Sequence, residues 1–262
     1  MSLASANAKN LLKKFNIKSL ANIDIEELCL AENLFIKTKE NLKCEGRIVF
    51  TNDTGIITIE KSIKEITHKR FIIAHEMGHY YNERHLADSK NLFYNCTGEN
   101  FFGLSGINKN KNELNASSFA DELLLPDEEL KTICKKRRFS FKLITEICSA
   151  FNVSLSTASF RLEQLNVFPS AIIMTCNQYV KWVKISAGFK YKFIQVGMKV
   201  NSLSYAYDFY NKKPIPNAED IPAEAWFKRD YTFCDRNERI MEMVIPMPRY
   251  NSAMVLLYEM IQ

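Results

Sequence analysis

The chain has 262 residues, of which 47% are hydrophobic and 25% are charged, as is typical of a globular protein with a sizeable core. Its formal charge of +5 comes from 35 basic and 30 acidic residues mixed along the chain, so charge alone does not indicate a nucleic-acid-binding surface. The amino terminus lacks a basic segment followed by an apolar core, and no apolar run reaches the roughly 18 residues that span a bilayer. We therefore expect a cytoplasmic protein without a membrane partner.

The cysteines do not indicate a disulfide framework. Their number is odd, they are scattered, and no CxxC pair is present that would suggest a thiolate zinc cage. We expect mostly buried, reduced thiols at these positions: Cys29, Cys44, Cys96, Cys134, Cys148, Cys176 and Cys234.

The first 60 residues predict two short helices followed by two strands. Apolar residues recur at helical spacing over residues 2–16 and 24–33, with Asp24 as a plausible N-cap. Residues 47–50 and 55–60 are β-prone and are joined by turn formers, which predicts a hairpin or two neighbouring strands.

Helical spacing continues through the middle of the chain. Residues 63–83 form one predicted helix, and residues 112–125 form another that Pro126 ends. The polar, glycine-containing segment 88–112 between them has the length of a functional flap or an insertion. Residues 141–150 and 154–165 predict a helical pair.

The last hundred residues have the character of strands. Residues 171–174, 179–183 and 254–258 are predicted strands, interrupted by a proline-bearing loop over residues 211–222. We place a domain boundary near Asn166.

The residues with the most chemistry lie in the predicted helix 63–83. His75-Glu76-Met77-Gly78-His79 is an HExxH motif, whose two histidines face the same way on a helix and can hold one zinc ion. Glu76, one position round the helix, can serve as a general base. The motif lies on a largely apolar helix face, which strengthens the metal-site interpretation over that of two core histidines.

A catalytic zinc site needs a third protein ligand, and two residues compete for this role. His85 reproduces the HExxHxxGxxH spacing of the metzincins, with Asn82 at the glycine position. Glu113 begins a helix on which Ala116, Ser117 and Ala120 share one stripe with it, so that helix can pack closely against the first.

At these residues the chain resembles the ImmA/IrrE family of metallopeptidases. The segments RFIIAHEMGHYY and ELNASSFADELLLP resemble the family's HExxH helix and its glutamate-led helix ending in a Phe-Ala-x-Glu-Leu-Leu-x-Pro signature. The resemblance implies that Zn²⁺ is held by His75, His79 and Glu113 with Glu76 as the base. Ser117 stands where the family tends to have asparagine or aspartate, which affects the hydrogen bonding of a ligand histidine.

The resemblance also implies an α+β fold in three parts. These are a zincin-like metallopeptidase domain over residues 1–126 with a small β-sheet and active-site helices, a helix-turn-helix-like segment over residues 127–166, and a mixed α/β sensor-like domain over residues 167–262, which in some members is of the GAF type.

We expect the chemistry to be zinc-assisted hydrolysis of a peptide bond. An extended substrate would add to an edge strand formed by residues 55–60, so that Ile56, Ile57, Thr58 and Ile59 are candidate substrate-binding residues, although a core strand is the competing interpretation. The resemblance implies a helix-turn-helix transcriptional repressor as substrate, which is cleaved to derepress a stress-response or mobile-element operon.

Two other classes of function compete with a peptidase. Residues 135–165 contain the basic run 135–138 and a helical pair that can be interpreted as a helix-turn-helix, with Ser156, Thr157, Ser159 and Gln164 as exposed positions that could touch DNA. A helical hairpin that closes the peptidase is the alternative for this segment. The third possibility is a metal-stabilised protein-binding module without turnover.

Overall fold

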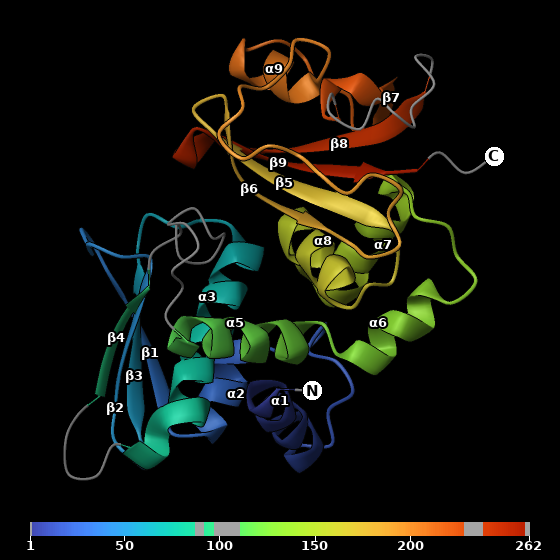
Figure 1. Cartoon of the computed structure of the whole chain (residues 1–262). Coiled ribbons are helices and arrows are strands. Elements are labelled where there is room, and N and C mark those ends of the chain that lie inside the picture. The colour runs from blue at the N-terminus through green and yellow to red at the C-terminus, as the bar shows by residue number, and fades with distance from the viewer. Residues whose placement is uncertain (1, 87–91, 97–110, 228–237, 260–262) are drawn as a thin grey trace. The chain divides into compact units, whose positions relative to one another are not determined.

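The computed structural model of the chain describes residues 2–86, 92–96, 111–227 and 238–259, and the chain divides into two compact units (Figure 1). Unit 1 contains Met1–Ile133 and Glu146–Ser154, and unit 2 contains Cys134–Thr145 and Leu155–Gln262. The expected α+β class is confirmed. The division into three parts at residues 126 and 166 stays a prediction.

Unit 1 combines α-helices with a small sheet. In chain order its elements are α1 (Leu3–Lys14), α2 (Ile25–Ala31), β1 (Leu34–Lys39), β2 (Gly46–Phe50), β3 (Gly55–Glu60), α3 (Ile66–Glu83), the 3-10 turn η1 (Arg84–Leu86), β4 (Leu92–Cys96), α5 (Lys111–Leu124) and α6 (Asp127–Cys134). Side chains of Ser2 and Asp24 accept backbone N–H groups at the starts of α1 and α2, as N-caps do.

The four strands of unit 1 form sheet A in the order β1-β3-β2-β4. The hairpin predicted over residues 47–60 is confirmed as the antiparallel pair β2 and β3, whereas β1 lies parallel to β3. The buried side chains Ile48 and Ile57 pair across β2 and β3, and α3 packs along these two strands (Figure 1). Sheet A therefore supports the helix that carries the HExxH motif.

Helices α3 and α5 lie very close together at Gly78. A Cβ atom at this position would lie 2.7 Å from the carbonyl oxygen of Ala116 and 2.8 Å from its Cα, which is closer than real atoms pack. Because the obstacle is backbone and not a flexible side chain, only glycine fits here. The small residue in HExxH is thus what lets α5 lie against the motif.

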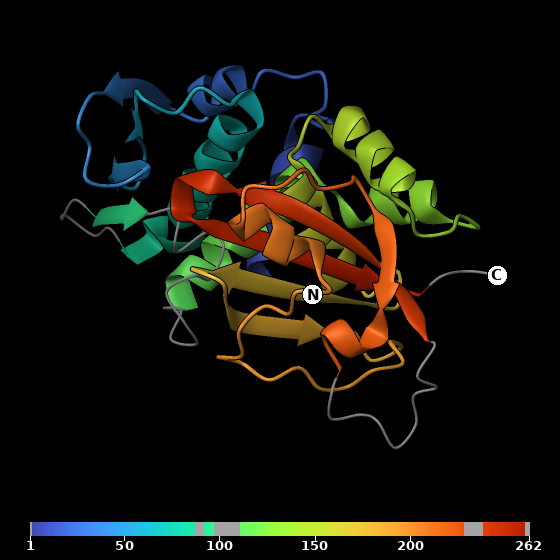
Figure 2. The same cartoon turned by 90° about the horizontal axis from the view of Figure 1, so that it is seen from above.

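Unit 2 is built on a five-stranded antiparallel sheet, sheet B. Its elements are α8 (Leu155–Gln164), β5 (Ser170–Cys176), β6 (Tyr179–Ile185), α9 (Tyr205–Tyr210), β7 (Glu219–Pro222), η2 (Ala223–Ala225), β8 (Arg239–Met247), η3 (Pro248–Tyr250) and β9 (Ser252–Tyr258). The strand order is β6-β5-β9-β8-β7, and the yellow to red arrows run side by side in both Figure 1 and Figure 2. A GAF-type fold for this unit stays a prediction.

A buried carboxylate ties the connections of unit 2 to its sheet. Glu242 on β8 is 1% exposed and accepts hydrogen bonds from Ser204 Oγ at 2.7 Å, Tyr205 N at 2.6 Å and Trp226 Nε1 at 2.8 Å. Burial raises the pKa of Glu242, and the three donors oppose that shift. One side chain therefore anchors the start of α9 and the turn η2 on β8.

The helical pair expected after Pro126 is present as α7 (Phe141–Phe151) and α8, joined by a turn in which Asn152 adopts a left-handed conformation. Of the four positions expected to be exposed, Gln164 is exposed, but the expectation is wrong for Ser156, Thr157 and Ser159, which are 7%, 7% and 1% exposed. Helix α8 packs on β5, and Phe160 lies against Trp182. The second helix of the pair therefore does not offer these side chains to DNA.

Several elements were not expected from the sequence. Strands β1 and β8 were not predicted, and β7 lies within the predicted proline-bearing loop. Of the expected flap 88–112, residues 92–96 form β4, and residues 88–91 and 97–110 lie outside the described residues. Among the described helices, none has both the length and the apolar character needed to cross a membrane.

The close contact at Gly78 gives a test of the packing. We expect Gly78→Ala to lower the free energy of unfolding by about 1–3 kcal/mol, because the methyl group forces α3 and α5 apart, partly offset by a gain of up to about 1 kcal/mol in helix propensity.

Gly188→Ala is the matched control, since its new Cβ would lie 3.4 Å from Pro169 Cγ, an ordinary contact. Denaturant unfolding measures both variants, and equal small effects would contradict the close approach.

Candidate metal centre

Helix α3 brings both histidines of the motif to one buried place. His75 and His79, one helical turn apart, are 0% exposed, and their ring centroids lie 5.0 Å apart. Glu76 between them is also 0% exposed, and its Oε1 lies close to Gly46 on β2, where a Cβ atom would be 2.7 Å from it. The motif thus forms a compact polar group inside an apolar helix face.

Helix α5 supplies a carboxylate to the same place. Glu113 lies in its first turn, less than one turn before Ala116, where α5 meets Gly78. Its Oε2 is 3.2 Å from His75 Nε2, and its Oε1 is 3.5 Å from His79 Nε2. One ligand atom from each of the three residues lies within 4.8 Å of the others. The expected convergence of His75, His79 and Glu113 is therefore present.

The other nitrogen of each imidazole has a partner outside this group. Ser117 Oγ lies 3.4 Å from His75 Nδ1, and Glu83 Oε1 lies 3.4 Å from His79 Nδ1. The serine thus lies where it can hold His75, although it is smaller than the residue that the family tends to have. Partners of this kind fix the orientation of a ring, and here both rings direct Nε2 toward Glu113.

Sequence reasoning missed three residues of this environment. Glu83 is 4% exposed and accepts a hydrogen bond from Asn112 Nδ2 at 3.3 Å, and Asn112 also lies 3.4 Å from the Tyr94 hydroxyl. The Tyr94 ring stacks on His79 with centroids 4.3 Å apart. Only Glu83 left a signal in the sequence, since it follows His79 by four residues on the same helix.

The charges of the three central side chains are strongly coupled. Burial opposes the charged form of His79, but hydrogen bonds to Glu113 and Glu83 outweigh it and raise the pKa of His79 to about 9. Burial likewise disfavours the Glu113 carboxylate, but hydrogen bonds from His75 and His79 hold the pKa of Glu113 well below its usual range. A carboxylate and a protonated imidazole therefore face each other in the metal-free protein.

The donor set fits a divalent transition metal. Two donors that are each about 2 Å from a zinc ion lie no more than about 4 Å apart, and both carboxylate–imidazole distances satisfy this limit. Two imidazoles with one carboxylate also match the three-ligand set of catalytic zinc sites. The cation would replace the proton that His79 holds, since only a neutral imidazole is a ligand.

The competing third ligand is placed differently. His85 is exposed on the turn η1 and does not belong to the cluster that His75, His79 and Glu113 form. Among the described residues the geometry therefore favours the glutamate over the metzincin-like arrangement.

The expectation that residues 55–60 form an edge strand is wrong. Strand β3 lies inside sheet A and is paired with β1 on one side and β2 on the other. Ile57, Thr58 and Ile59 are buried, and Ile56 is 42% exposed. The backbone of these residues is therefore already used within the sheet, and the terminal strands are β1 and β4.

Comparison with known proteins covers the part of the chain that contains these residues. Residues 36–163, which include His75, Glu76, His79 and Glu113, match the model of the IrrE N-terminal-like domain, Peptidase_M78. The chain is 28% identical over 159 residues to metallopeptidase ImmA of Bacillus subtilis (strain 168), which covers 60% of this chain and 85% of that protein.

The fold is also similar to a solved structure of a Mycobacterium tuberculosis transcriptional regulator. The TM-score is 0.57 at 13% sequence identity, and the match covers 99% of this chain and 77% of that one. At this identity the likeness concerns the fold alone.

The two possible third ligands can be separated by metal analysis. We expect Glu113→Ala to weaken zinc binding by more than about 100-fold, beyond the loss that an outer partner of a ligand causes. His85→Ala should keep about one zinc per chain. Competition with a chromophoric chelator measures both, and the opposite ranking would favour His85 as the ligand.

The raised pKa of His79 predicts opposite pH trends for two properties. In the metal-free protein its contribution to stability is complete below the unfolded value of 6.5 and is lost as pH rises through about 9. Zinc affinity should increase over the same interval, because binding displaces the proton.

Thermal unfolding of the metal-free protein and zinc titration between these pH values test this pair of trends. His79→Asn is the control and should remove both, whereas a metal-free stability that rises toward pH 9 in the unmodified chain would contradict the proposed charge pair.

Proposed function

We propose, from the premise that residues 36–163 form an IrrE N-terminal-like domain and that the chain is a distant homologue of metallopeptidase ImmA, that this protein is a zinc-dependent endopeptidase. The observation that carries the proposal is the convergence of His75 and His79 from α3 with Glu113 from α5. We assign these three residues as metal ligands and Glu76 as the general base.

The chain's own residues support each part of the hydrolysis. Zn²⁺ bound here would polarise the scissile carbonyl and lower the pKa of water. Glu76 would accept the proton of the attacking water and return it to the leaving amine. Its side chain is completely buried beside Gly46. Ser117 and Glu83 would hold the imidazoles in position.

Because β3 is internal, we propose that the substrate binds along β4. Strand β4 ends the row β1-β3-β2-β4, and the ring of Tyr94 on this strand stacks on His79. An extended peptide that adds to a sheet edge is held mainly by backbone hydrogen bonds, and side-chain pockets then select the sequence. A peptide on β4 would run beside the proposed ligands, which supports cleavage within an extended segment of a protein.

We further propose a helix-turn-helix transcriptional repressor as the substrate and the cytoplasm as the site of action. Both follow from the family resemblance, and cleavage would derepress a stress-response or mobile-element operon. A DNA-binding regulator that acts through α8 without turnover is less well supported, because Ser156, Thr157 and Ser159 are buried.

The decisive test is Glu76→Gln, which removes the base and leaves the proposed ligands. We expect cleavage to fall by about 10²–10⁴-fold while zinc content is retained. New protein termini can be identified by mass spectrometry in cells that express either the unmodified chain or the variant. Termini that also form with Glu76→Gln would remove the enzyme assignment.

A further inference from the structure

The formal charge of +5 is distributed unequally between the two units. Unit 2 carries 18 Lys and Arg against 10 Asp and Glu, a formal charge of +8, whereas unit 1 carries 17 against 20, a formal charge of −3. Between Glu163 and Asp208 the sequence contains five lysines and no acidic residue. The positive charge is therefore a property of one folded unit, which makes an anionic partner of that unit a physical expectation.

Contacts within unit 2 bring distant basic segments to one end of sheet B. Ser170 pairs with Tyr258, and Ser186 N donates to Ser170 O at 2.9 Å, so the starts and ends of β5, β6 and β9 meet here. The Phe139 ring packs 4.7 Å from the Tyr258 ring and 5.0 Å from the Phe168 ring. The basic run 135–138, which directly precedes Phe139, is thereby fixed to this end of the sheet.

Three more lysines come from β6 and the connection after it. Lys184 lies two residues before Ser186, and Lys190 N donates to Glu259 Oε1, directly after Tyr258. Lys192 Nζ donates to Ala187 O at 2.6 Å, which holds it over the same turn. All of these side chains are exposed, as are the four of the run 135–138. We call residues 135–138 with Lys184, Lys190 and Lys192 the basic end.

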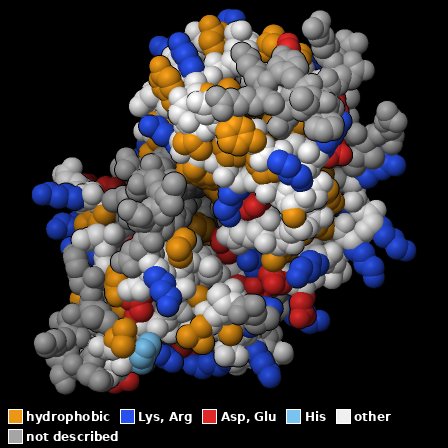
Figure 3. Space-filling model, viewed as in Figure 1, with side chains coloured by type: hydrophobic (Ala, Val, Ile, Leu, Met, Phe, Trp, Pro, Cys, Tyr) orange, Lys and Arg blue, Asp and Glu red, His pale blue; other side chains and the backbone are white. Residues whose placement is uncertain are grey.

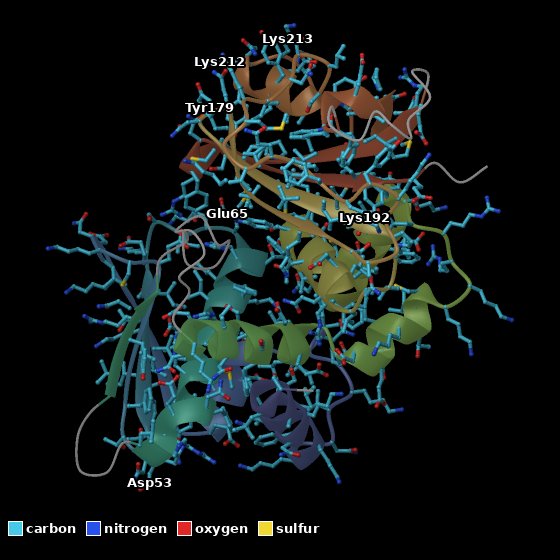
Figure 4. All side chains as sticks on the ribbon, in the orientation of Figure 1. Asp53, Glu65, Tyr179, Lys192, Lys212 and Lys213 are labelled. Carbon is cyan, nitrogen blue, oxygen red and sulfur yellow. The ribbon has the colours of Figure 1, made fainter. Side chains whose placement is uncertain are left out.

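Figure 3 shows Lys and Arg side chains along the right-hand margin of unit 2, and Figure 4 labels Lys192 on the connection beside β6. Glu163 pairs with Lys184 at 3.0 Å, and Glu238 and Glu259 contact Lys190. These three carboxylates are fewer than the seven cationic side chains, and unit 2 as a whole carries a formal charge of +8.

We propose that the basic end of unit 2 binds the phosphate backbone of double-stranded DNA. A group of exposed Lys and Arg side chains suits phosphates and carries no base specificity of its own. Single-stranded nucleic acid is bound through successive exposed aromatic rings. Phe139, Phe189 and Tyr191 are 7%, 0% and 3% exposed, whereas Phe193, next to Lys192, is 46% exposed. One exposed ring does not form a series of stacking platforms, so we commit to a duplex partner and make single-stranded binding an outcome of the test.

This DNA contact is distinct from the peptidase activity and uses none of its residues. Together with the proposed function, it would hold the enzyme near a repressor that is bound to an operator. The local concentration of a DNA-bound substrate would then rise without any contact between protease and repressor outside the cleaved segment.

The test uses the full-length, zinc-loaded protein and a fluorescent DNA duplex of about 30 base pairs with random sequence. Fluorescence anisotropy measures the binding at several salt concentrations. We expect the logarithm of the binding constant to fall linearly with the logarithm of the salt concentration, because binding to phosphates releases counterions. A variant with Lys135→Gln, Lys136→Gln, Lys190→Gln and Lys192→Gln should reduce the slope by about 0.9 for each phosphate contact that is lost. Its affinity at low salt should fall at least about tenfold.

The matched control removes the same number of exposed charges from unit 1, by Lys18→Gln, Lys37→Gln, Lys39→Gln and Lys64→Gln, and should bind like the unmodified chain. Circular dichroism checks that both variants are folded. Equal losses in both variants, or no binding at low salt, would overturn the proposal. So would tighter binding to a single-stranded oligonucleotide, or binding to vesicles containing phosphatidylserine without binding to DNA.

Discussion

The backbone contact between Gly78 and Ala116 is the constraint on which the metal centre depends. A helix side chain reaches only a few ångströms, so a carboxylate on α5 can meet two imidazoles on α3 only when the two helix axes come unusually close. The missing Cβ at Gly78 permits this, and the small residue at position 116 completes the fit. Sheet A then fixes the other side of α3 through β2 and β3. The position of Glu113 is thus a result of helix packing, and its low pKa is in turn a result of that position.

The sequence predicted those residues of the site that lie close together in the chain or within a family signature. His75, Glu76 and His79 follow from helix periodicity, and Glu113 was identified by its stripe of small residues and a family signature. Glu83 was missed although it lies on the same helix. Tyr94 and Asn112 could not be found, because their place beside His79 depends on where the segment after η1 returns to the sheet.

The errors in the sheets have a common physical origin. The hairpin of β2 and β3 is a local pairing that turn residues determine, and it was predicted. The pairing of β1 with β3 and of β4 with β2 is set by tertiary packing, so the apolar residues of β3 did not reveal that this strand is internal. Likewise the 3.6-residue pattern of α8 located the helix but not the face that becomes buried. The net charge of the whole chain did not reveal that the two units carry charges of opposite sign. The residues that belong to each unit have to be known before their charges can be counted separately.

His75 and Glu113 are separated by 38 positions in the chain, so their side chains share a site only after α3 and α5 have docked. The unfolded chain retains only the two histidines four residues apart as neighbouring ligands, so it binds a cation far more weakly than the folded protein does. Any ion bound by the three residues therefore favours the native state by mass action, in proportion to the logarithm of its free concentration over the dissociation constant. The abundance of the folded protein in a cell becomes linked to metal supply, and starvation for that metal would expose the chain to proteolysis as well as silence its chemistry.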